Sequence, residues 1–237
     1  MPELTLLDLV RNGTMSAGVA ATLSAIAEEK MSFMIVAVPR LAGKSTVGRA
    51  MLDFAPRSAP LHHLSGSEAE MEELAQRPDG GYLVVAEFAD VDMSSYIWGS
   101  PVRRVFQTMR AGFSLSVGLH APTVEEAYAA VCHGNGVADE DASQISYMVY
   151  IERMGANRDD FWRRIAAVYE VDRVVGGVPH ARLLHRWRRE SDRFEQVEHP
   201  QLLSIREKAL EERAKRFQEL ADAGRTGPAH VEALRTP

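Results

Sequence analysis

The order of apolar runs and helical stretches in this sequence predicts an α/β fold built on a mostly parallel sheet. Apolar, strand-like runs at residues 33–38, 82–88 and 114–119 alternate with helical stretches, a pattern typical of parallel strands joined by crossover helices. The run at 82–88 is apolar almost throughout, as expected of a central strand that is buried on both faces. From residue 145 onward, strand-like segments follow one another without helices, so we expect added antiparallel strands there.

The elements before residue 133 can be placed from local signals. Residues 3–13 and 16–29 repeat apolar residues at helical spacing, and Asn12-Gly13 and Ser16 mark the end and the start of the two helices. The parallel part continues with a short strand at 59–64, a helix that begins at Ser65 or Ser67, and helices after Ser100 and after Thr123, which is a favourable N-cap residue.

The C-terminal third divides differently. The expected antiparallel strands are 145–153, 164–172, 181–187 and 192–197, followed by a charged helix with a narrow apolar stripe. We therefore expect one domain over residues 1–199 with a helical lead-in at 1–30, a C-terminal helix at 200–222, and a flexible tail at 223–237.

Length and composition restrict the class of protein. The chain has 237 residues, of which 46% are hydrophobic and 25% charged, a balance that suits one large soluble domain. The net charge of −6 argues against nucleic-acid binding driven by overall charge. Cys132 is the only cysteine, which excludes an internal disulfide. With no apolar run of membrane-spanning length and no positively charged leader, we expect a cytoplasmic protein.

The segment 33–46 has the strand–loop–helix pattern of a phosphate-binding P-loop, although Val38 stands where the pattern has its first glycine. Loop N–H groups and the start of the following helix favour an oxyanion, Lys44 would place a charge on the terminal phosphates, and the Ser45 hydroxyl would bind Mg²⁺. Because Val38 is β-branched and disfavours a positive φ, we expect the loop to turn differently from one that begins with glycine. The expected residues at the phosphates of ATP are Pro39, Arg40, Leu41, Ala42, Gly43, Lys44, Ser45 and Thr46.

The apolar run at 82–88 carries Glu87 near its end, and the Glu87 carboxylate would lie at the same sheet edge as the P-loop segment. Phosphoryl transfer needs an acid there to order the metal or the attacking water, so we expect Glu87 to act as a catalytic residue and as a Mg²⁺ ligand. His120 also ends an apolar strand, at the edge where α/β sheets bind their ligands. The alternatives are that Glu87 only begins a solvated loop, and that His120 is a hydrogen-bonded histidine under a loop.

Three motifs in this order resemble the secretion and pilus-assembly ATPases of the type II and type IV systems. The P-loop segment is followed by Ala86-Glu87-Phe88-Ala89-Asp90, which is similar to the family's Walker B segment, and by residues 118–127, which are similar to its histidine box. Over residues 3–175 this resemblance implies a RecA-like P-loop ATPase domain that hydrolyses ATP, assembles as a hexamer and serves a secretion or pilus machine. It implies that His120 senses the terminal phosphate and that Glu68 belongs to an acidic box near the hydrolytic water.

The sequence leaves two other interpretations of the function open. Val38 and Ala89 depart from the family's pattern, which favours a degenerate scaffold or regulator that does not hydrolyse nucleotide. A small-molecule kinase could use the same loop, but kinases of this kind usually close an arginine-bearing lid, and no clear lid lies between Lys44 and Glu87.

Several other clusters are more simply explained as structural. His62 and His63 are adjacent on an expected strand and point to opposite faces, so they cannot easily share a metal, and Cys132-His133 has the same limitation. The arginines of the helix after residue 100 could include one that reaches a phosphate, and a basic segment near Trp187 could meet an acidic partner; solvated faces are the commoner explanation for both. These residues are Arg103, Arg104 and Arg110 in the first group, and Arg182, His185, Arg186, Arg188 and Arg189 in the second.

Overall fold

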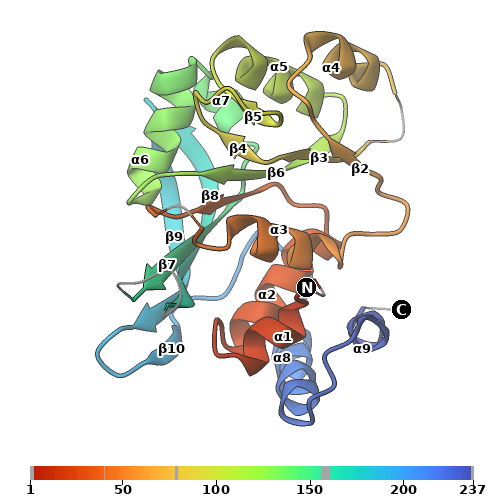
Figure 1. Cartoon of the computed structure of the whole chain (residues 1–237), viewed down its shortest axis with the longest axis vertical. Coiled ribbons are helices and arrows are strands. Elements are labelled where there is room, and N and C mark those ends of the chain that lie inside the picture. Colours follow the sequence, from red (N-terminus) through yellow and green to blue (C-terminus); the bar gives the residue numbers. More distant parts are fainter. Residues whose placement is uncertain (1–2, 40, 78–79, 156–160, 236–237) are drawn as a thin grey trace.

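The chain folds around one large β-sheet (Figure 1). The computed structural model describes residues 3–39, 41–77, 80–155 and 161–235. Within these residues eight strands form the sheet, in the order β10-β9-β8-β7-β1-β6-β3-β2. Their bounds are β1 Phe33–Val36, β2 Leu61–His63, β3 Gly81–Val85, β6 Phe113–Leu119, β7 Tyr147–Met154, β8 Trp162–Val175, β9 Val178–Arg188 and β10 Arg193–Gln196.

The sheet has a parallel part and an antiparallel part. Strands β2, β3, β6, β1 and β7 are parallel neighbours, whereas β7, β8, β9 and β10 are joined by antiparallel pairs. The predicted fold class, a mostly parallel α/β sheet with antiparallel strands added toward the C-terminus, is confirmed. Strand β7 pairs antiparallel with β8, as expected, and it also pairs parallel with β1, with Phe33 opposite Tyr147, which the sequence did not predict. Helices separate β6 from β7 in the chain, which gives the crossover that a parallel strand needs.

Both faces of the sheet are covered, as strand β1 illustrates. Phe33 and Ile35 belong to one apolar core, and Met34 and Val36 to the other, because successive side chains of a strand point to opposite faces. All four side chains are buried. The uninterrupted apolar run in the sequence is therefore explained by a strand between two layers of helices.

The two layers of helices come from different parts of the chain. One core includes residues of α1 (Leu6–Arg11), α2 (Ala17–Glu28), α3 (Lys44–Leu52), α8 (Glu207–Asp222) and α9 (Pro228–Glu232). The other includes residues of α4 (Glu68–Ala75), α5 (Ser100–Met109), α6 (Val124–Ala129), the π-helical turn η1 (Ala130–Gly134) and α7 (Asp139–Ala142). Across the described ranges, every helix falls short of the length and apolarity that a bilayer crossing requires.

Side-chain caps determine where two of the predicted helices begin. The Ser16 hydroxyl accepts a hydrogen bond from the Val19 N–H at 3.2 Å, and the Thr123 hydroxyl accepts one from the Glu126 N–H at 3.1 Å. Each bond satisfies a backbone donor that has no partner within its helix. Both predicted N-caps are confirmed.

The C-terminal helix starts later than expected. Helix α8 begins at Glu207 and not at residue 200, because side-chain carboxylates hold the preceding segment outside a helix. Glu170 is fully buried on β8 and accepts hydrogen bonds from the N–H groups of Gln201 and Leu202, both at 2.9 Å. These bonds fix the chain where it leaves the sheet and crosses to the helical layer.

The residues after α8 are also more ordered than the predicted tail. Helix α9 follows, and Val231 and Leu234 are buried in the same core as α1 and α2. The stretch expected to be a flexible tail, 223–237, thus includes a short helix packed on the core. Polar contacts accompany the two apolar side chains, such as the ion pair of Arg57 with Glu232 at 2.8 Å.

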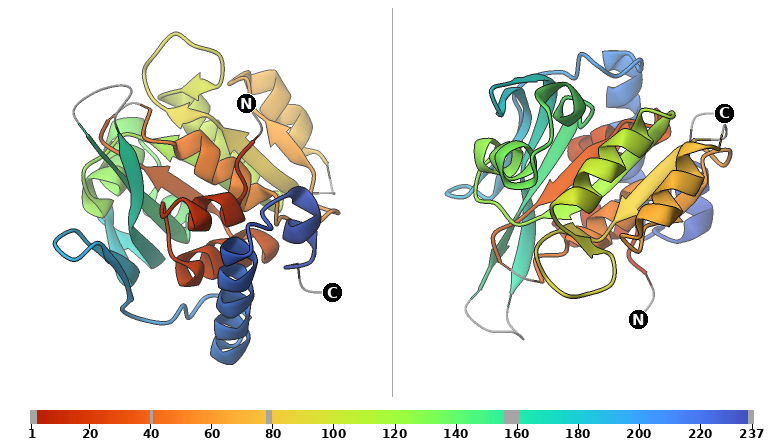
Figure 2. Two further views of the ribbon diagram at one scale, coloured as in Figure 1. Left: turned by 60° about the horizontal axis from the view of Figure 1, so that its bottom comes forward. Right: turned by 90° about the horizontal axis from the view of Figure 1, so that it is seen from above.

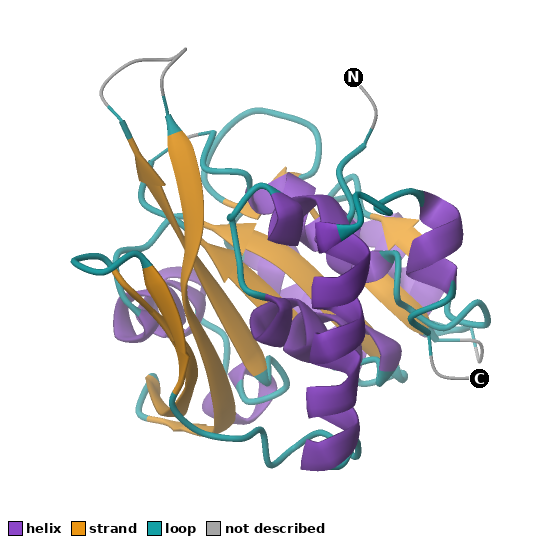
Figure 3. Cartoon of the chain, turned by 90° about the horizontal axis from the view of Figure 1, so that it is seen from below, coloured by secondary structure: helices purple, strands orange, loops and turns teal. Residues whose placement is uncertain are grey.

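Helix α8 packs against the N-terminal helix α2 (Figure 2), and Figure 3 shows helices lying in front of the sheet strands when the molecule is seen from below. Arg213 of α8 is buried, and its Nη2 lies 2.6 Å from Oε2 of Glu28 at the end of α2. The rings of Phe217 and Phe54 pack with their centroids 5.8 Å apart. The two ends of the chain thus form one layer against the sheet.

Candidate functional site

The loop of residues 37–43 joins β1 to α3 and is called here the β1–α3 loop; Arg40 lies outside the described residues. The loop takes left-handed backbone conformations at Leu41, with φ of 62°, and at Gly43, with φ of 97°. Val38 keeps a negative φ, so the missing first glycine is not needed for the turn. A left-handed leucine costs about 1–2 kcal/mol, and this strain is stored where the backbone amides approach the cavity described below.

Strand order brings three predicted residues together. Because β6 lies between β1 and β3, the carboxyl ends of these strands carry His120, the β1–α3 loop and Glu87 to the same edge. Lys44 Nζ lies 3.0 Å from Glu87 Oε2 and 3.0 Å from His120 Nε2, and His120 Nε2 lies 3.1 Å from Glu87 Oε1. We call Lys44, Glu87 and His120 the edge triad.

Carbonyl oxygens of the β1–α3 loop lie close to one ring nitrogen of His120. Its Nδ1 lies 2.8 Å from the carbonyl oxygen of Ala37 and 3.0 Å from that of Val38. A carbonyl oxygen only accepts, so these contacts are hydrogen bonds when Nδ1 carries a proton; Lys44 Nζ also lies 3.3 Å from Nδ1. The other ring nitrogen, Nε2, faces Lys44 and Glu87, and the contacts of Nδ1 tie the imidazole to the β1–α3 loop.

Two charged side chains of the edge triad are buried. The side chains of Lys44 and Glu87 are 10% and 7% exposed. Burial lowers the pKa of the Lys44 ammonium, and the hydrogen bond and charge of Glu87 oppose that change. Removing one partner of a buried ion pair leaves the other charge uncompensated, which is costly. A ligand that separates Lys44 from Glu87 must therefore be an anion that pairs with Lys44 instead.

The edge triad borders a cavity of about 410 Å³. Its floor is the β1–α3 loop and the first turn of α3, where Gly43 provides no side-chain cap, so that the first N–H groups of the helix are available to an anion. Its lining residues are Leu41, Ala42, Gly43, Lys44, Ser45, Thr46, Glu87, Val91, Met93, Tyr96, His120 and Arg163. The oxygens of Ser45 and Glu87 are the kind of donors that Mg²⁺ prefers when it keeps waters and binds phosphates, so this donor set fits the metal.

Glu87 itself belongs to a small ribbon and not to β3. The predicted strand 82–88 is interrupted at Ala86, and β4 (Glu87–Phe88) pairs with β5 (Tyr96–Ile97). A Cβ on Gly118 of β6 would lie 2.5 Å from the Ala86 carbonyl oxygen. The close approach that this glycine permits allows the chain to turn at Ala86 and to bring Glu87 over the cavity.

Some of the predicted site residues lie elsewhere. Glu68 is the exposed first residue of α4 and does not line the cavity, so the structure agrees with the simpler reading of a carboxylate at a helix N-terminus. Pro39 is also absent from the cavity lining among the described residues. The acidic-box role expected for Glu68 is not supported, because the turn after β2 carries α4 to the opposite helical layer.

The arginine clusters are engaged within the chain. Arg103 donates to the Asn135 carbonyl at 2.7 Å, Arg104 lies 3.4 Å from Glu72, and Arg110 lies 2.8 Å from Asp141. In the basic segment near Trp187, the partners are Glu170 for Arg182, Glu195 for Arg186 and Arg188, Glu152 for Arg189, and Thr22 for His185. The structure thus supports the structural explanation of both groups.

The histidine and cysteine pairs form no metal cluster. Within the residues that the structure describes, no group of three or more histidine, cysteine, aspartate or glutamate side chains is arranged to hold a metal ion. His62 and His63 lie on β2, and Cys132 and His133 lie in η1. Burial raises the pKa of the Cys132 thiol to about 11.

Arg163 is a residue at the cavity that the sequence analysis missed. It is near the start of β8, and its Nη2 donates to the Leu41 carbonyl oxygen at 2.9 Å. No motif marks it, because it reaches the β1–α3 loop only through the pairing of β8 with β7 and of β7 with β1. Knowledge of that strand order was the one signal that could have found it.

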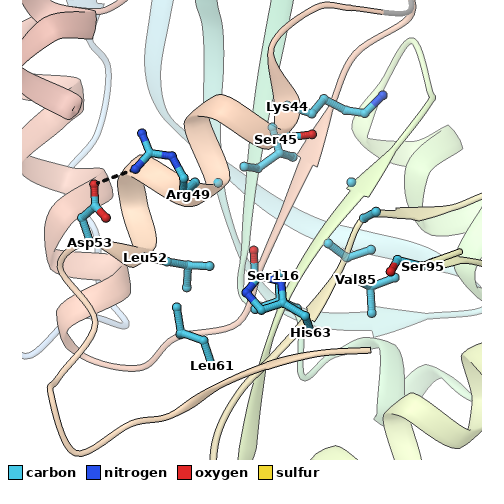
Figure 4. Close-up of a pocket in the computed structure, with 16 residues that line it drawn as sticks. Lys44, Ser45, Arg49, Leu52, Asp53, Leu61, His63, Val85, Ser95 and Ser116 are labelled. Carbon is cyan, nitrogen blue, oxygen red and sulfur yellow. Dashed lines mark hydrogen bonds and ion pairs between the residues drawn. The ribbon is translucent and has the colours of Figure 1, made fainter. Parts of the chain in front are cut away.

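A second cavity, of about 340 Å³, lies beside α3 and the strands β3 and β6 (Figure 4). Lys44 and Ser45 border it at one end, and Leu61 and His63 border it at the other. Its walls are mostly apolar, whereas the cavity of the edge triad combines a cation, a carboxylate, an imidazole and hydroxyl groups. The chemistry of the site therefore lies in the latter.

The fold and the edge triad together define an α/β protein in which a lysine, a glutamate and a histidine meet at the carboxyl edge of a mostly parallel sheet. No family model and no curated protein sequence matches the chain. Among solved structures, the chain is similar to the VirB11 ATPase from the Brucella suis type IV secretion system in complex with sulphate, at 14% identity and a TM-score of 0.46. The match covers 70% of this chain and 54% of that ATPase, so the chain spans about half its length. This is a distant similarity.

Proposed function

We propose that this chain binds MgATP at the edge triad and hydrolyses it. The observation that carries the proposal is the mutual contact of Lys44, Glu87 and His120 beside the first turn of α3. A lysine, a carboxylate and helix N–H groups at one sheet edge match the needs of phosphoryl transfer, in which the protein mainly positions groups and stabilises charge.

Each residue has a role in this proposal. Lys44 and the N–H groups of the β1–α3 loop hold the phosphates, and the Ser45 hydroxyl holds Mg²⁺, which neutralises phosphate charge when bound. Glu87 orders a water molecule on the metal or in line with the terminal phosphate. His120 contacts the terminal phosphate, and because its Nδ1 also contacts the loop carbonyl oxygens, it couples phosphate binding to the conformation of the β1–α3 loop.

The contacts within the edge triad suggest how binding proceeds. Lys44 already has an anionic partner in Glu87, so a nucleotide must exchange one carboxylate contact for phosphate contacts. A magnesium ion that binds near Glu87 would balance the negative charge of that carboxylate once Lys44 pairs with phosphate. We therefore expect ATP to bind much more tightly with Mg²⁺ than without it.

We also propose that the protein is part of a larger secretion or pilus machine, and this part rests only on the sequence motifs. Their resemblance to secretion and pilus motors supports an oligomer, with a hexamer as the family's assembly, acting in the cytoplasm as a component of such a machine. Sizing the protein by light scattering with and without MgATP tests this part separately.

Calorimetric titration with MgATP and a phosphate-release assay test the proposal in wild type, Lys44→Ala and Glu87→Gln, with Lys215→Ala on the exposed face of α8 as the control for loss of one lysine. We expect Lys44→Ala to weaken binding more than about tenfold, Glu87→Gln to bind but not turn over, and Lys215→Ala to behave as wild type. Absence of binding at millimolar MgATP would refute the proposal and leave a scaffold. Turnover that requires an added hydroxy compound would indicate a kinase.

A further inference from the structure

Arg163 reaches the cavity from the antiparallel part of the sheet. Its Nη2 donates to the Leu41 carbonyl oxygen at 2.9 Å, and its side chain lines the same cavity as Lys44. Because the C=O and N–H of a trans peptide point to opposite sides, this hydrogen bond also fixes the direction of the Ala42 N–H. Arg163 is thus in direct contact with the most strained part of the β1–α3 loop.

The absence of a side chain at Gly43 leaves space for Arg163. A Cβ at residue 43 would lie 3.0 Å from Cδ and 3.1 Å from Nε of Arg163, closer than ordinary van der Waals contact. The glycine therefore serves two purposes, since it allows a φ of 97° and leaves room for the guanidinium against the loop. Arg163 and the start of α3 therefore line the same side of the cavity.

A second arginine lies beside Arg163. Arg153 on β7 lies directly opposite it in the strand register, and both guanidinium groups lie over the Phe161 ring, at 4.4 Å for Arg153 and 4.6 Å for Arg163. Like charges directly opposite each other destabilise a strand pair. Burial and the charge of Arg153 lower the pKa of the Arg163 guanidinium.

Arg163 also has donor capacity that the described residues do not use. Its Nε is buried and has no hydrogen-bond partner among the residues that the structure describes, and a guanidinium offers five N–H groups in a fork that suits phosphate oxygens. A buried donor without a partner is costly. A phosphate in the cavity would satisfy this donor and would also relieve the repulsion between the two arginines.

We propose that Arg163 is a second phosphate-binding cation of the site, one that binds the nucleotide phosphates together with Lys44 while it holds the Leu41 carbonyl. The proposal rests on the proposed function, because it names a further residue of the same site. It places one contact of the nucleotide on β8, so that the antiparallel strands take part in binding and do not merely extend the sheet.

The test measures dissociation constants for MgATP and for inorganic tripolyphosphate with wild type, Arg163→Gln and Arg163→Lys. Arg173→Gln is the matched control, since it removes the same charge from the exposed far end of β8. We expect Arg163→Gln to weaken both ligands about tenfold or more, Arg163→Lys to recover part of the loss because it restores the charge without the fork, and Arg173→Gln to bind as wild type does.

The outcomes separate the two proposals. If Lys44→Ala loses binding but Arg163→Gln binds within about twofold of wild type, the inference about Arg163 is wrong and the proposed function stands. If wild type binds neither MgATP nor tripolyphosphate, both are wrong. Should Arg163→Gln fail to fold, phenylglyoxal modification of wild type mapped by mass spectrometry provides a second test. We expect MgATP to protect Arg163 and not Arg173, and equal labelling of Arg163 with and without MgATP would overturn the inference.

Discussion

His185 is a titratable group buried between the sheet and the N-terminal helical layer. It lies on β9, it is 3% exposed, and its Nε2 lies 2.8 Å from the hydroxyl oxygen of Thr22 on α2. Burial, with a smaller effect of His199, lowers the pKa of His185 from 6.5 to about 4. The native protein therefore keeps this histidine neutral at a pH where the unfolded chain protonates it.

This difference predicts how stability depends on pH. Well above pH 6.5 the histidine is neutral in both states and its titration does not change the free energy of unfolding. As the pH falls through 6.5 toward 4, the unfolded state binds a proton that the native state does not. At about 1.4 kcal/mol per pKa unit, the free energy of unfolding loses about 3 kcal/mol over that range. About 2 kcal/mol of this loss falls between pH 7 and pH 5.

Urea unfolding followed by circular dichroism at pH 7, 6 and 5 measures the effect in wild type and in His185→Gln. The variant should be less stable at pH 7 and should lose about 2 kcal/mol less than wild type on acidification. His180→Gln, which removes an exposed histidine paired with Asp172 at 2.8 Å, serves as the matched control. Parallel pH profiles for wild type and His185→Gln would refute the reasoning, because they would mean that His185 titrates alike in both states.

Two further substitutions test how the site and the helical layer are held. Gly118→Ala places a Cβ 2.5 Å from the Ala86 carbonyl oxygen and 3.3 Å from Lys44 Cε, so we expect a loss of about 1–3 kcal/mol in urea unfolding; an unchanged midpoint would contradict the close approach. Arg213→Met removes the ion pair between Arg213 and Glu28 across α8 and α2, and we expect the free energy of unfolding to fall by about 2 kcal/mol. The double variant with Glu28→Gln should recover part of that loss, and equal losses in the single and double variants would argue against the pair.

The parts of the fold that local patterns encode were predictable from the sequence. The apolar run at β1, the caps at Ser16 and Thr123, and the acid after the next central strand each depend on neighbouring residues. For this reason the sequence predicted that Lys44, Glu87 and His120 would lie at one edge. Their distances depend on β6 lying between β1 and β3, which no single segment encodes.

The errors have a common physical origin in long-range placement. The resemblance implied that Glu68 belongs to an acidic box near the site, but the chain after β2 takes it to the layer of helices opposite α3. Arg163 lies just before the expected strand at 164–172, and it reaches the β1–α3 loop through two strand pairings. The left-handed turn falls on Leu41, a residue whose type disfavours it, so local propensity pointed away from it.

The packing of α8 along α2 has a consequence for the order in which the chain can mature during synthesis. Helix α2 is buried along most of its length, and part of its cover comes from α8, whose Arg213 contacts Ser24 of α2 at a separation of 189 residues. During synthesis α2, β1 and α3 are therefore made well before α8. Because contacts between distant residues form late and leave apolar surface exposed in the meantime, we expect α2 to expose part of its apolar surface until α8 has been synthesised.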